Sequence, residues 1–247
     1  MNMNSFEGKR ILALIRDGDY AHAGEEEAIE RALRSVPKNP QGWMLLDVGC
    51  GRGGSAEYLR RHGWGKLVGI DRENDSIEYA TATYPDVEFH TCDVLDVPAN
   101  VTREFDVIYL LNAFYAFADQ RNALAALRKV AKLGARLVIF DYAISGGPKE
   151  ADLSVEGRVF IPHPIQLSAI GDLILESGWQ PGAVEDLSAD YTRWYAAFVE
   201  RIRRKQDEIE KIGGAKWYRF VLSMYSGLHD VIASGKLGGA IVHGTAV

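Results

Sequence analysis

The 247-residue chain carries 28 Lys and Arg against 34 Asp and Glu, a net charge of −6, and this balance argues against a nucleic-acid partner, which needs a basic surface. It has no apolar run of the ~20 residues that a membrane-spanning helix requires, and its first ten residues lack the apolar core of a secretion signal. With only Cys50 and Cys92 and no CxxC motif, the composition predicts a cytoplasmic globular protein without a membrane segment, a disulfide framework or a zinc site.

Two helices are predicted in the first 40 residues, which we interpret as an N-terminal helical cap, residues 1–40. The first contains the apolar cluster Ile11–Ile15, which a turn at Asp17 and Gly18 follows. The second is expected over Glu25–Val36, because three acids stand in its first turn, where the positive end of a helix dipole favours them.

From Met44 onward short apolar runs alternate with amphipathic stretches. Strands are predicted at Met44–Val48, Leu67–Ile70, Val87–Cys92, Phe105–Leu111 and Leu137–Phe140, and helices at Gly54–His62, Asn74–Thr83 and Asp119–Lys132, the last with Asp119 as N-cap and Gly134 as C-cap. Continuous apolar strands separated by helices are typical of a parallel sheet that is covered on both faces. The pattern therefore predicts a doubly wound α/β fold.

The remaining third of the chain is predicted to add helices to this core. We expect a loop over Ser145–Pro164, a helix over Ile165–Ser177, a strand at Ala183–Leu187, a long helix over Asp190–Ile212, another over Trp217–Ala233, and a last strand at Ala240–Val247. This gives an α/β core of residues 41–187 and 238–247 with a helical insertion at 188–237. The insertion either caps a substrate site or mediates a homodimer.

The first predicted strand leads directly into a glycine-rich loop, Gly49-Cys50-Gly51-Arg52-Gly53-Gly54, and then into a helix. Glycine permits positive φ and close approach of the backbone to a ligand. Doubly wound sheets bind nucleotides at this position. The spacing G-x-G-x-x-G also occurs in NAD-dependent oxidoreductases, and a tight turn without any ligand is a third interpretation.

Three carboxylates near the predicted strand ends help to distinguish these interpretations of the glycine loop. Asp71 ends the second strand, where it either accepts hydrogen bonds from ribose hydroxyls or caps the next helix. Asp93 follows the third strand, where it either accepts from an adenine amino group or is a solvated turn residue. Asp47 precedes the glycines, and an acid there would repel a pyrophosphate but attract the ammonium of a methionine moiety.

Together these segments resemble class I S-adenosylmethionine-dependent methyltransferases. The stretch from Asp47 to Gly54 is similar to the first motif of that family, Phe105–Asn112 to its fourth-strand motif, and Leu133–Ile139 to its fifth-strand motif, although a proline and a second glycine are missing there. The resemblance implies S-adenosylmethionine as the cofactor, a seven-stranded sheet of order 3-2-1-4-5-7-6 with an antiparallel last strand, and a set of cofactor-binding residues: Asp47, Gly49, Cys50, Gly51, Gly53, Asp71, Arg72, Asp93, Val94, Leu111 and Asn112.

The sequence after the fourth strand limits the acceptor. It reads Asn112-Ala113-Phe114-Tyr115, whereas family members that methylate nucleobase or amide nitrogens usually carry a pair of prolines there. Asp141 stands alone near the fifth strand, so we predict no metal. The layout is similar to methyltransferases for glycine, sarcosine, phosphoethanolamine or sterol-like compounds, which predicts a small-molecule acceptor of a methyl group on N, O or C.

Candidates for a catalytic base are Tyr20, His22 and Tyr115, the first two in a segment that could cover the site; His163 is interpreted as a rigid loop residue. For each, a purely structural role is the alternative. Aromatic residues of the long helix, Tyr191, Trp194, Tyr195 and Phe198, either pack on the core or line a pocket, and the basic cluster Arg201–Lys205 is expected on its solvated face. A catalytically silent cofactor-binding module on the same fold is the remaining hypothesis.

Overall fold

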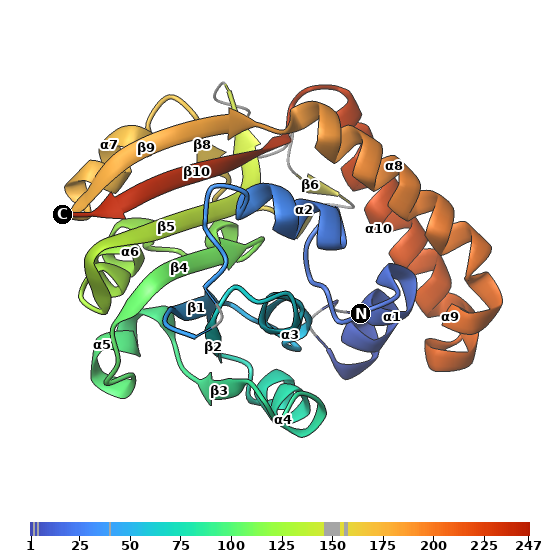
Figure 1. Ribbon diagram of the computed structural model, residues 1–247. Coiled ribbons are helices and arrows are strands. Elements are labelled where there is room, and N and C mark those ends of the chain that lie inside the picture. The colour runs from blue at the N-terminus through green and yellow to red at the C-terminus, as the bar shows by residue number, and fades with distance from the viewer. Residues whose placement is uncertain (2, 4, 40, 146–153, 156–157) are drawn as a thin grey trace.

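The central sheet has the strand order that the sequence predicted. The computed structural model describes the chain except residues 2, 4, 40, 146–153 and 156–157. Its strands run in the order β3 (Glu88–Thr91), β2 (Lys66–Asp71), β1 (Met44–Val48), β4 (Phe105–Leu111), β5 (Ala131–Ile144), β10 (Gly238–Ala246) and β9 (Trp179–Asp186). β1 to β5 pair in parallel and β10 is antiparallel to both of its neighbours, so the predicted order 3-2-1-4-5-7-6 is confirmed (Figure 1).

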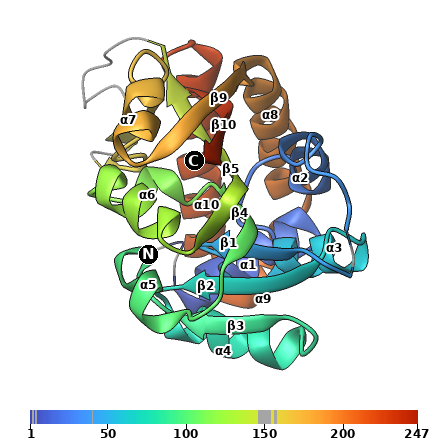
Figure 2. The same ribbon diagram turned by 60° about the vertical axis from the view of Figure 1, so that its left-hand side comes forward.

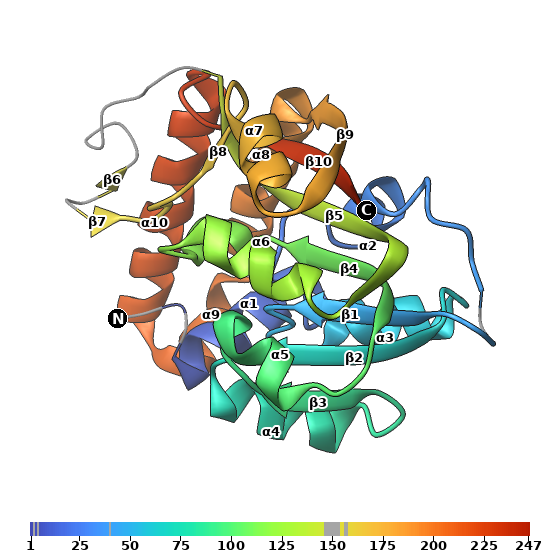
Figure 3. The same cartoon turned by 90° about the vertical axis from the view of Figure 1, so that its left-hand side faces the viewer.

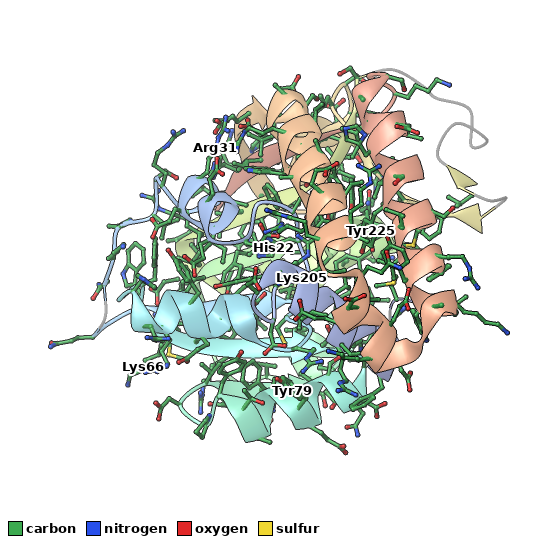
Figure 4. All side chains as sticks on the ribbon, turned by 90° about the vertical axis from the view of Figure 1, so that its right-hand side faces the viewer. His22, Arg31, Lys66, Tyr79, Lys205 and Tyr225 are labelled. Atoms are coloured by element: carbon green, nitrogen blue, oxygen red, sulfur yellow. The ribbon has the colours of Figure 1, made fainter. Side chains whose placement is uncertain are left out.

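Helices cover both faces of this sheet. The connections between strands form α3 (Gly54–Arg61), α4 (Asn74–Thr83), α5 (Val97–Asn100), α6 (Gln120–Arg128) and α7 (Ile170–Glu176). Figures 2 and 3 show α6 and α7 on the same side of the sheet, and Figure 4, from the opposite side, shows α3 and the insertion helices. The fold is thus doubly wound, as predicted.

The strands are buried on both faces because their alternate side chains enter two separate cores. On β4, Val107 and Tyr109 belong to the core that also holds the N-terminal helices and the insertion. Ile108 and Leu110 point to the core beneath α5, α6 and α7. This double burial explains why the strands read as continuous apolar runs rather than alternating ones.

The N-terminal helices and the insertion lie side by side at one end of the molecule. α1 (Phe6–Arg16) and α2 (Glu25–Ala32) precede the sheet, and the insertion between β9 and β10 consists of α8 (Ser188–Arg204), α9 (Gln206–Gly213) and α10 (Ala215–Ala233). α1 contacts both α8 and α9, as Figure 1 shows for its blue and orange helices. None of the helices in the described residues is long and apolar enough to cross a membrane.

One predicted helix ends earlier than expected. The helix at Asp119 ends at Arg128 rather than Lys132, and Gly134 is not its C-cap. Instead β5 begins at Ala131, which pairs with Phe105, so pairing with β4 overrides the local helical pattern. Gly134, with φ of 77°, lies inside β5 where its register against β4 shifts. The N-cap was correct: the Asp119 side chain accepts a hydrogen bond from Asn122 N.

Two further elements differ from the prediction. The segment at Ile165 is not helical: it forms β8 (Ile165–Gln166), which pairs with β5, and α7 begins only at Ile170. The long helix expected over Asp190–Ile212 is divided at Lys205 into α8 and α9. Of the predicted loop Ser145–Pro164, residues 146–153 and 156–157 lie outside the described residues; the rest includes the short strands β6 (Ser154–Val155) and β7 (Arg158–Val159).

Candidate functional site

A cavity of about 450 Å³ opens at the carboxyl ends of the parallel strands. Its floor comes from the loops after β1, β2, β3 and β4, and its walls come from α1, the segment that follows α1, and the insertion helices. Of the residues predicted from the sequence, those that line it are Tyr20, Gly49, Gly51, Asp71, Arg72, Asp93, Val94, Asn112 and Tyr115. Most of the predicted cofactor residues are thus brought together.

The glycine loop adopts a shape that only glycine permits without strain. Gly49, Gly51 and Gly53 have φ of 75°, 53° and 84°, values that cost other residues about 1–2 kcal/mol. A Cβ at Gly49 would lie 2.5 Å from the Ala113 Cβ in the loop after β4, and one at Gly53 would lie 2.6 Å from the Phe89 ring. The loop therefore approaches its neighbours closely and leaves its own backbone open toward the cavity.

Backbone amides hold the Asp71 carboxylate at the cavity wall. One carboxylate oxygen accepts from Gly51 N at 2.8 Å, and the other accepts from Glu73 N at 2.9 Å. Each oxygen retains a lone pair. The carboxylate is thus oriented and still able to accept hydrogen bonds from the two hydroxyls of a ribose.

Asp93 is fixed in a similar way after β3. Its Oδ1 accepts from Leu95 N at 3.0 Å, which caps a short 3₁₀ helix, and Val94 and Leu95 also line the cavity. A carboxylate beside two apolar side chains can receive an adenine ring and its amino group. Asp93 and Asp71 line the same cavity.

Asp47 lies behind the glycine loop rather than in the cavity wall. Its side chain is 2% exposed, and its Oδ2 has no hydrogen-bond partner among the described residues. Burial raises the pKa of Asp47 to about 7, and the nearby charge of Asp71 adds to this. The Asp47 carboxyl group behind the loop and the Asp71 carboxylate at the cavity wall disfavour the pyrophosphate of a dinucleotide and favour a cationic ligand end.

We expect Asp47 to make stability pH-dependent. Because its folded pKa is raised, the native state binds more protons than the unfolded state between about pH 4 and 7, so stability falls as pH rises through this window. Asp47→Asn removes this cost and should be more stable than the wild type at pH 8, by at most about 4 kcal/mol for a shift of about three units. Urea unfolding at pH 5 and pH 8 measures the difference; equal pH dependence in both proteins would contradict it.

Three predicted cofactor residues support the site without lining it. Cys50 is 6% exposed, and burial raises the pKa of its thiol. Gly53 shapes the loop through its positive φ, and Leu111 is the last residue of β4, buried in the core. Asn112, which follows Leu111, has φ of 52° and lines the cavity.

The proposed bases differ in their positions. Tyr20 and Tyr115 line the cavity, but His22 does not. His22 is 2% exposed, donates through Nδ1 to the carbonyl oxygen of Ala23, and accepts through Nε2 from the Ser55 hydroxyl at 2.9 Å. Burial lowers the pKa of His22 to about 3. The structure therefore does not support His22 as a base; it connects the N-terminal segment to α3.

The two tyrosines are poor bases as well. The Tyr20 hydroxyl donates to Glu26 at 3.0 Å, and burial, followed by this hydrogen bond, raises its pKa. Burial and the charge of Asp141 raise the pKa of Tyr115. Both hydroxyls stay protonated at neutral pH, so they can donate hydrogen bonds but cannot accept a proton readily.

The segment after α1 covers the glycine loop. The Asp19 carboxylate accepts from the hydroxyls of Tyr79 and Tyr84 at 3.2 and 2.7 Å and lies 2.8 Å from Arg52 Nε. The Arg52 guanidinium also lies over the Tyr79 ring, 3.5 Å from its centroid. We call residues 17–24 the covering segment. Arg52 belongs to the glycine motif and could have been considered from the sequence. Nothing in the sequence, however, marks Asp19 as its partner.

The far wall of the cavity combines Tyr195, which the sequence offered as a possible pocket residue, with three residues that the sequence did not indicate. Arg16 ends α1, Tyr142 lies near the end of β5, and Tyr195 comes from α8. Tyr225, which Figure 4 labels, comes from α10. The hydroxyls of Tyr142 and Tyr195 form a hydrogen bond. Tyr142 could have been found from its place at a strand end, because ligands bind there in such sheets.

Of the four aromatic residues predicted on α8, only Tyr195 lines the cavity; Tyr191, Trp194 and Phe198 pack in the core. Two of the basic residues near its end also depart from the predicted solvated face. Arg201 pairs with Glu25, and Lys205 donates to the Leu14 carbonyl and pairs with Asp17, next to α1 (Figure 4). The insertion is therefore attached to the N-terminal segment.

Asp141, the acid near the fifth strand, is held by backbone amides. It is fully buried at the end of β5 and accepts from the backbone amides of Tyr115 and Tyr142 at 3.1 and 2.7 Å. Burial raises its pKa to about 7. No group of three or more His, Cys, Asp or Glu side chains suited to a metal ion occurs in the described residues.

Comparison with known proteins agrees with the motifs, the sheet order and the cavity. Residues 46–139 match the family model described as a methyltransferase domain, and the motifs and sheet order are similar to those of class I S-adenosylmethionine-dependent methyltransferases. It is 29% identical over 171 residues to an O-methyltransferase of Penicillium expansum, covering 66% of this chain and 61% of that protein. It is 28% identical to phosphoethanolamine N-methyltransferase 1 of Arabidopsis thaliana, covering 78% of this chain and 38% of that protein.

Two solved structures share the fold over nearly the whole chain. Phosphoethanolamine N-methyltransferase 2 of Haemonchus contortus superposes with a TM-score of 0.85 at 16% identity, covering 97% of this chain and 57% of the other. A putative sarcosine dimethylglycine methyltransferase of Galdieria sulphuraria superposes with a TM-score of 0.80 at 14% identity, covering 96% and 97%. At these identities the likeness establishes the fold and not the acceptor.

Proposed function

We propose that this chain transfers the methyl group of S-adenosylmethionine to a small-molecule acceptor. The observation that carries the proposal is the convergence of the glycine loop, Asp71 and Asp93 on one cavity, with the buried carboxyl of Asp47 behind it. These groups match the parts of the cofactor: ribose hydroxyls at Asp71, adenine at Asp93 and Val94, and the methionine moiety toward Gly49 and Asn112.

When bound, the cofactor supplies an activated methyl group on a positively charged sulfur. The chain's own task is then to hold donor and acceptor in line and to exclude water. The covering segment performs the second part, because Asp19 and Arg52 close over the loop and Tyr20 and Ala21 line the cavity. The insertion supplies the opposite wall through Tyr195 and Tyr225, which favours a cap over a dimerisation surface as its role.

The nature of the acceptor atom follows from the cavity wall. No histidine lines the cavity in the described residues, and the pKa values of Tyr20 and Tyr115 are raised. A neutral amine or an already ionised oxygen attacks without losing a proton to the protein, whereas an alcohol would need a base. We therefore propose an amine or an acidic hydroxyl as the methyl acceptor, positioned by Tyr115 and Tyr142.

Calorimetric titration with S-adenosylhomocysteine tests the cofactor assignment. We expect the wild type to bind it with micromolar affinity and to bind NADH at least 100-fold more weakly. Asp71→Ala should weaken S-adenosylhomocysteine binding at least tenfold, since it removes two ribose hydrogen bonds worth about 1.4 kcal/mol or more together. Asp75→Ala, an exposed acid on α4, is the matched control and should bind as the wild type does.

The result also separates the alternatives. Preferential binding of NADH would favour an oxidoreductase and overturn the proposal. Binding of S-adenosylhomocysteine without methyl transfer to any amine, phenol or thiol would instead favour a silent cofactor-binding module. Equal affinity of wild type and Asp71→Ala would show that the cavity does not hold the ribose at Asp71.

A further inference from the structure

Arg16 is a buried cation in the wall of the proposed active site. It is 5% exposed, lies at the end of α1, and lines the cavity together with Tyr195 and Tyr225. Its guanidinium lies over the Phe198 ring, 4.3 Å from the centroid. Its Nε is buried and has no hydrogen-bond partner among the described residues. Buried arginines are rare unless paired, so this incomplete pairing requires a reason.

The charge around Arg16 is not balanced. Within the described part of the chain its only acidic partner is Glu25, at 2.6 Å, and the same Glu25 oxygen also pairs with Arg201 at 2.8 Å. The two guanidinium groups therefore share one carboxylate. Lys205, the next cation along α8, already pairs with Asp17. The nearby His22 is neutral, and the charge of Arg16 contributes to that. One positive charge remains beside the cavity.

Hydroxyl groups surround this charge. Tyr195 and Tyr225 lie close enough to Arg16 for its charge to favour their ionised forms, although burial keeps the pKa of both raised. Tyr142 adds a third hydroxyl through its hydrogen bond with Tyr195. A guanidinium with a spare N–H, next to tyrosine O–H donors, is the group that binds a carboxylate or phosphate in a planar, two-pronged contact.

We infer that the methyl acceptor carries an anionic group, a carboxylate or phosphate, which Arg16 binds between α1 and the insertion helices. The inference rests on the proposed methyl transfer and adds the charge class of the substrate. The alternative anion that Arg16 could bind is the carboxylate of the cofactor's methionine moiety. The contacts of Arg16 favour the acceptor, because apart from Glu25 on α2 they come from α8 and α10 rather than from the loops after β1, β2 and β3.

Titration of paired probes into the protein saturated with S-adenosylhomocysteine tests the inference. The pairs are phosphoethanolamine with ethanolamine, sarcosine with sarcosinamide, and 4-hydroxybenzoate with its methyl ester. We expect the anionic member of at least one pair to bind the wild type at least tenfold more tightly than its neutral counterpart. Arg16→Gln should abolish this preference, and Arg16→Lys should retain part of it.

Arg201→Gln is the matched control, since Arg201 shares Glu25 but does not line the cavity. It should keep the preference for the anion, and thermal unfolding identifies any variant that has lost its fold. If Arg201→Gln loses the preference equally, the effect is a general loosening of the segment, and the inference is wrong. A wild type without preference for any anionic probe would also overturn it.

A second measurement separates the two anion sources. S-adenosylhomocysteine carries the amino-acid carboxylate and 5′-methylthioadenosine does not, so the ratio of their affinities reports on the contact with that carboxylate. The ratio should be the same for the wild type and Arg16→Gln; a tenfold fall in the variant would assign Arg16 to the cofactor and overturn the inference. If the wild type binds no S-adenosylhomocysteine, the proposed function fails, and the probe titrations without it still test the anion site.

Discussion

Gly49→Ala is expected to abolish cofactor binding while leaving the sheet folded. The added Cβ would meet the Ala113 Cβ at 2.5 Å, and Gly49 has φ of 75°. The variant thus combines the cost of the left-handed conformation, about 1–2 kcal/mol, with overpacking of about 1–3 kcal/mol. Relief requires the loops after β1 and β4 to separate, and these are the loops that we propose hold the methionine end of the cofactor. We expect S-adenosylhomocysteine affinity to fall at least 100-fold, equivalent to about 2.7 kcal/mol.

Gly235→Ala provides the matched control for the backbone cost. Gly235 has φ of 74° but no heavy atom within 4 Å of its Cβ position, and it lies in the turn after α10. It should lose about 1–2 kcal/mol of stability and keep the wild-type affinity. If both variants bind S-adenosylhomocysteine equally well, the contact between Gly49 and Ala113 is not needed for the cofactor site.

The meeting of the proposed cofactor residues at one cavity could be predicted from the sequence, because each of them lies close to the end of a strand. Gly49, Gly51, Asp71 and Asp93 each lie at the carboxyl end of a strand or within three residues after it, and parallel strands bring their carboxyl ends to one edge of a sheet. Their positions in the sequence therefore already predict that these residues lie close together in the fold. Asp47 is the exception: its position next to the loop was evident, but the structure places its carboxyl behind the loop, not in the cavity.

The acceptor half could not be predicted because it depends on distant segments that meet only in the folded chain. Arg16 follows an apolar cluster and has no motif around it. Tyr225 lies in a helix with several other aromatic residues, and nothing in the sequence distinguishes it from them. Arg201 looked like a solvated cation because its partner, Glu25, is 176 residues away. Likewise, Ala131 joined β5 through pairing with Phe105, which the local helical pattern did not reveal.

The covering segment connects these two halves, and its attachments suggest how binding is coordinated. Asp19 holds it to the glycine loop through Arg52 and to α4 and its C-cap through Tyr79 and Tyr84. Glu25, just after the segment, holds the insertion through Arg201. A displaced segment would therefore open the cofactor pocket and move the wall that contains Arg16 at the same time.

Gly54→Ala tests the contribution of the covering segment separately from that of the other parts of the site. Gly54 is the first residue of α3 and has an ordinary φ, so alanine costs the helix nothing. Its Cβ would lie 2.7 Å from the Asp19 carbonyl oxygen and 2.8 Å from the carbonyl carbon, and backbone at that distance has to move away. We expect S-adenosylhomocysteine to dissociate at least tenfold faster, an effect of about 1.4 kcal/mol on affinity, and trypsin to cleave near Arg16 sooner.

Gly171→Ala, in the first turn of α7, is the matched control, because its Cβ position has no neighbour within 4 Å. Alanine there should stabilise the protein by up to about 1 kcal/mol through helix propensity and leave dissociation unchanged. Stopped-flow displacement of S-adenosylhomocysteine measures both variants. Wild-type dissociation and cleavage rates in Gly54→Ala would mean that the segment does not retain the cofactor. Retention would then come from Asp71 and from the part of the glycine loop that precedes Gly54, since these are unchanged in the variant.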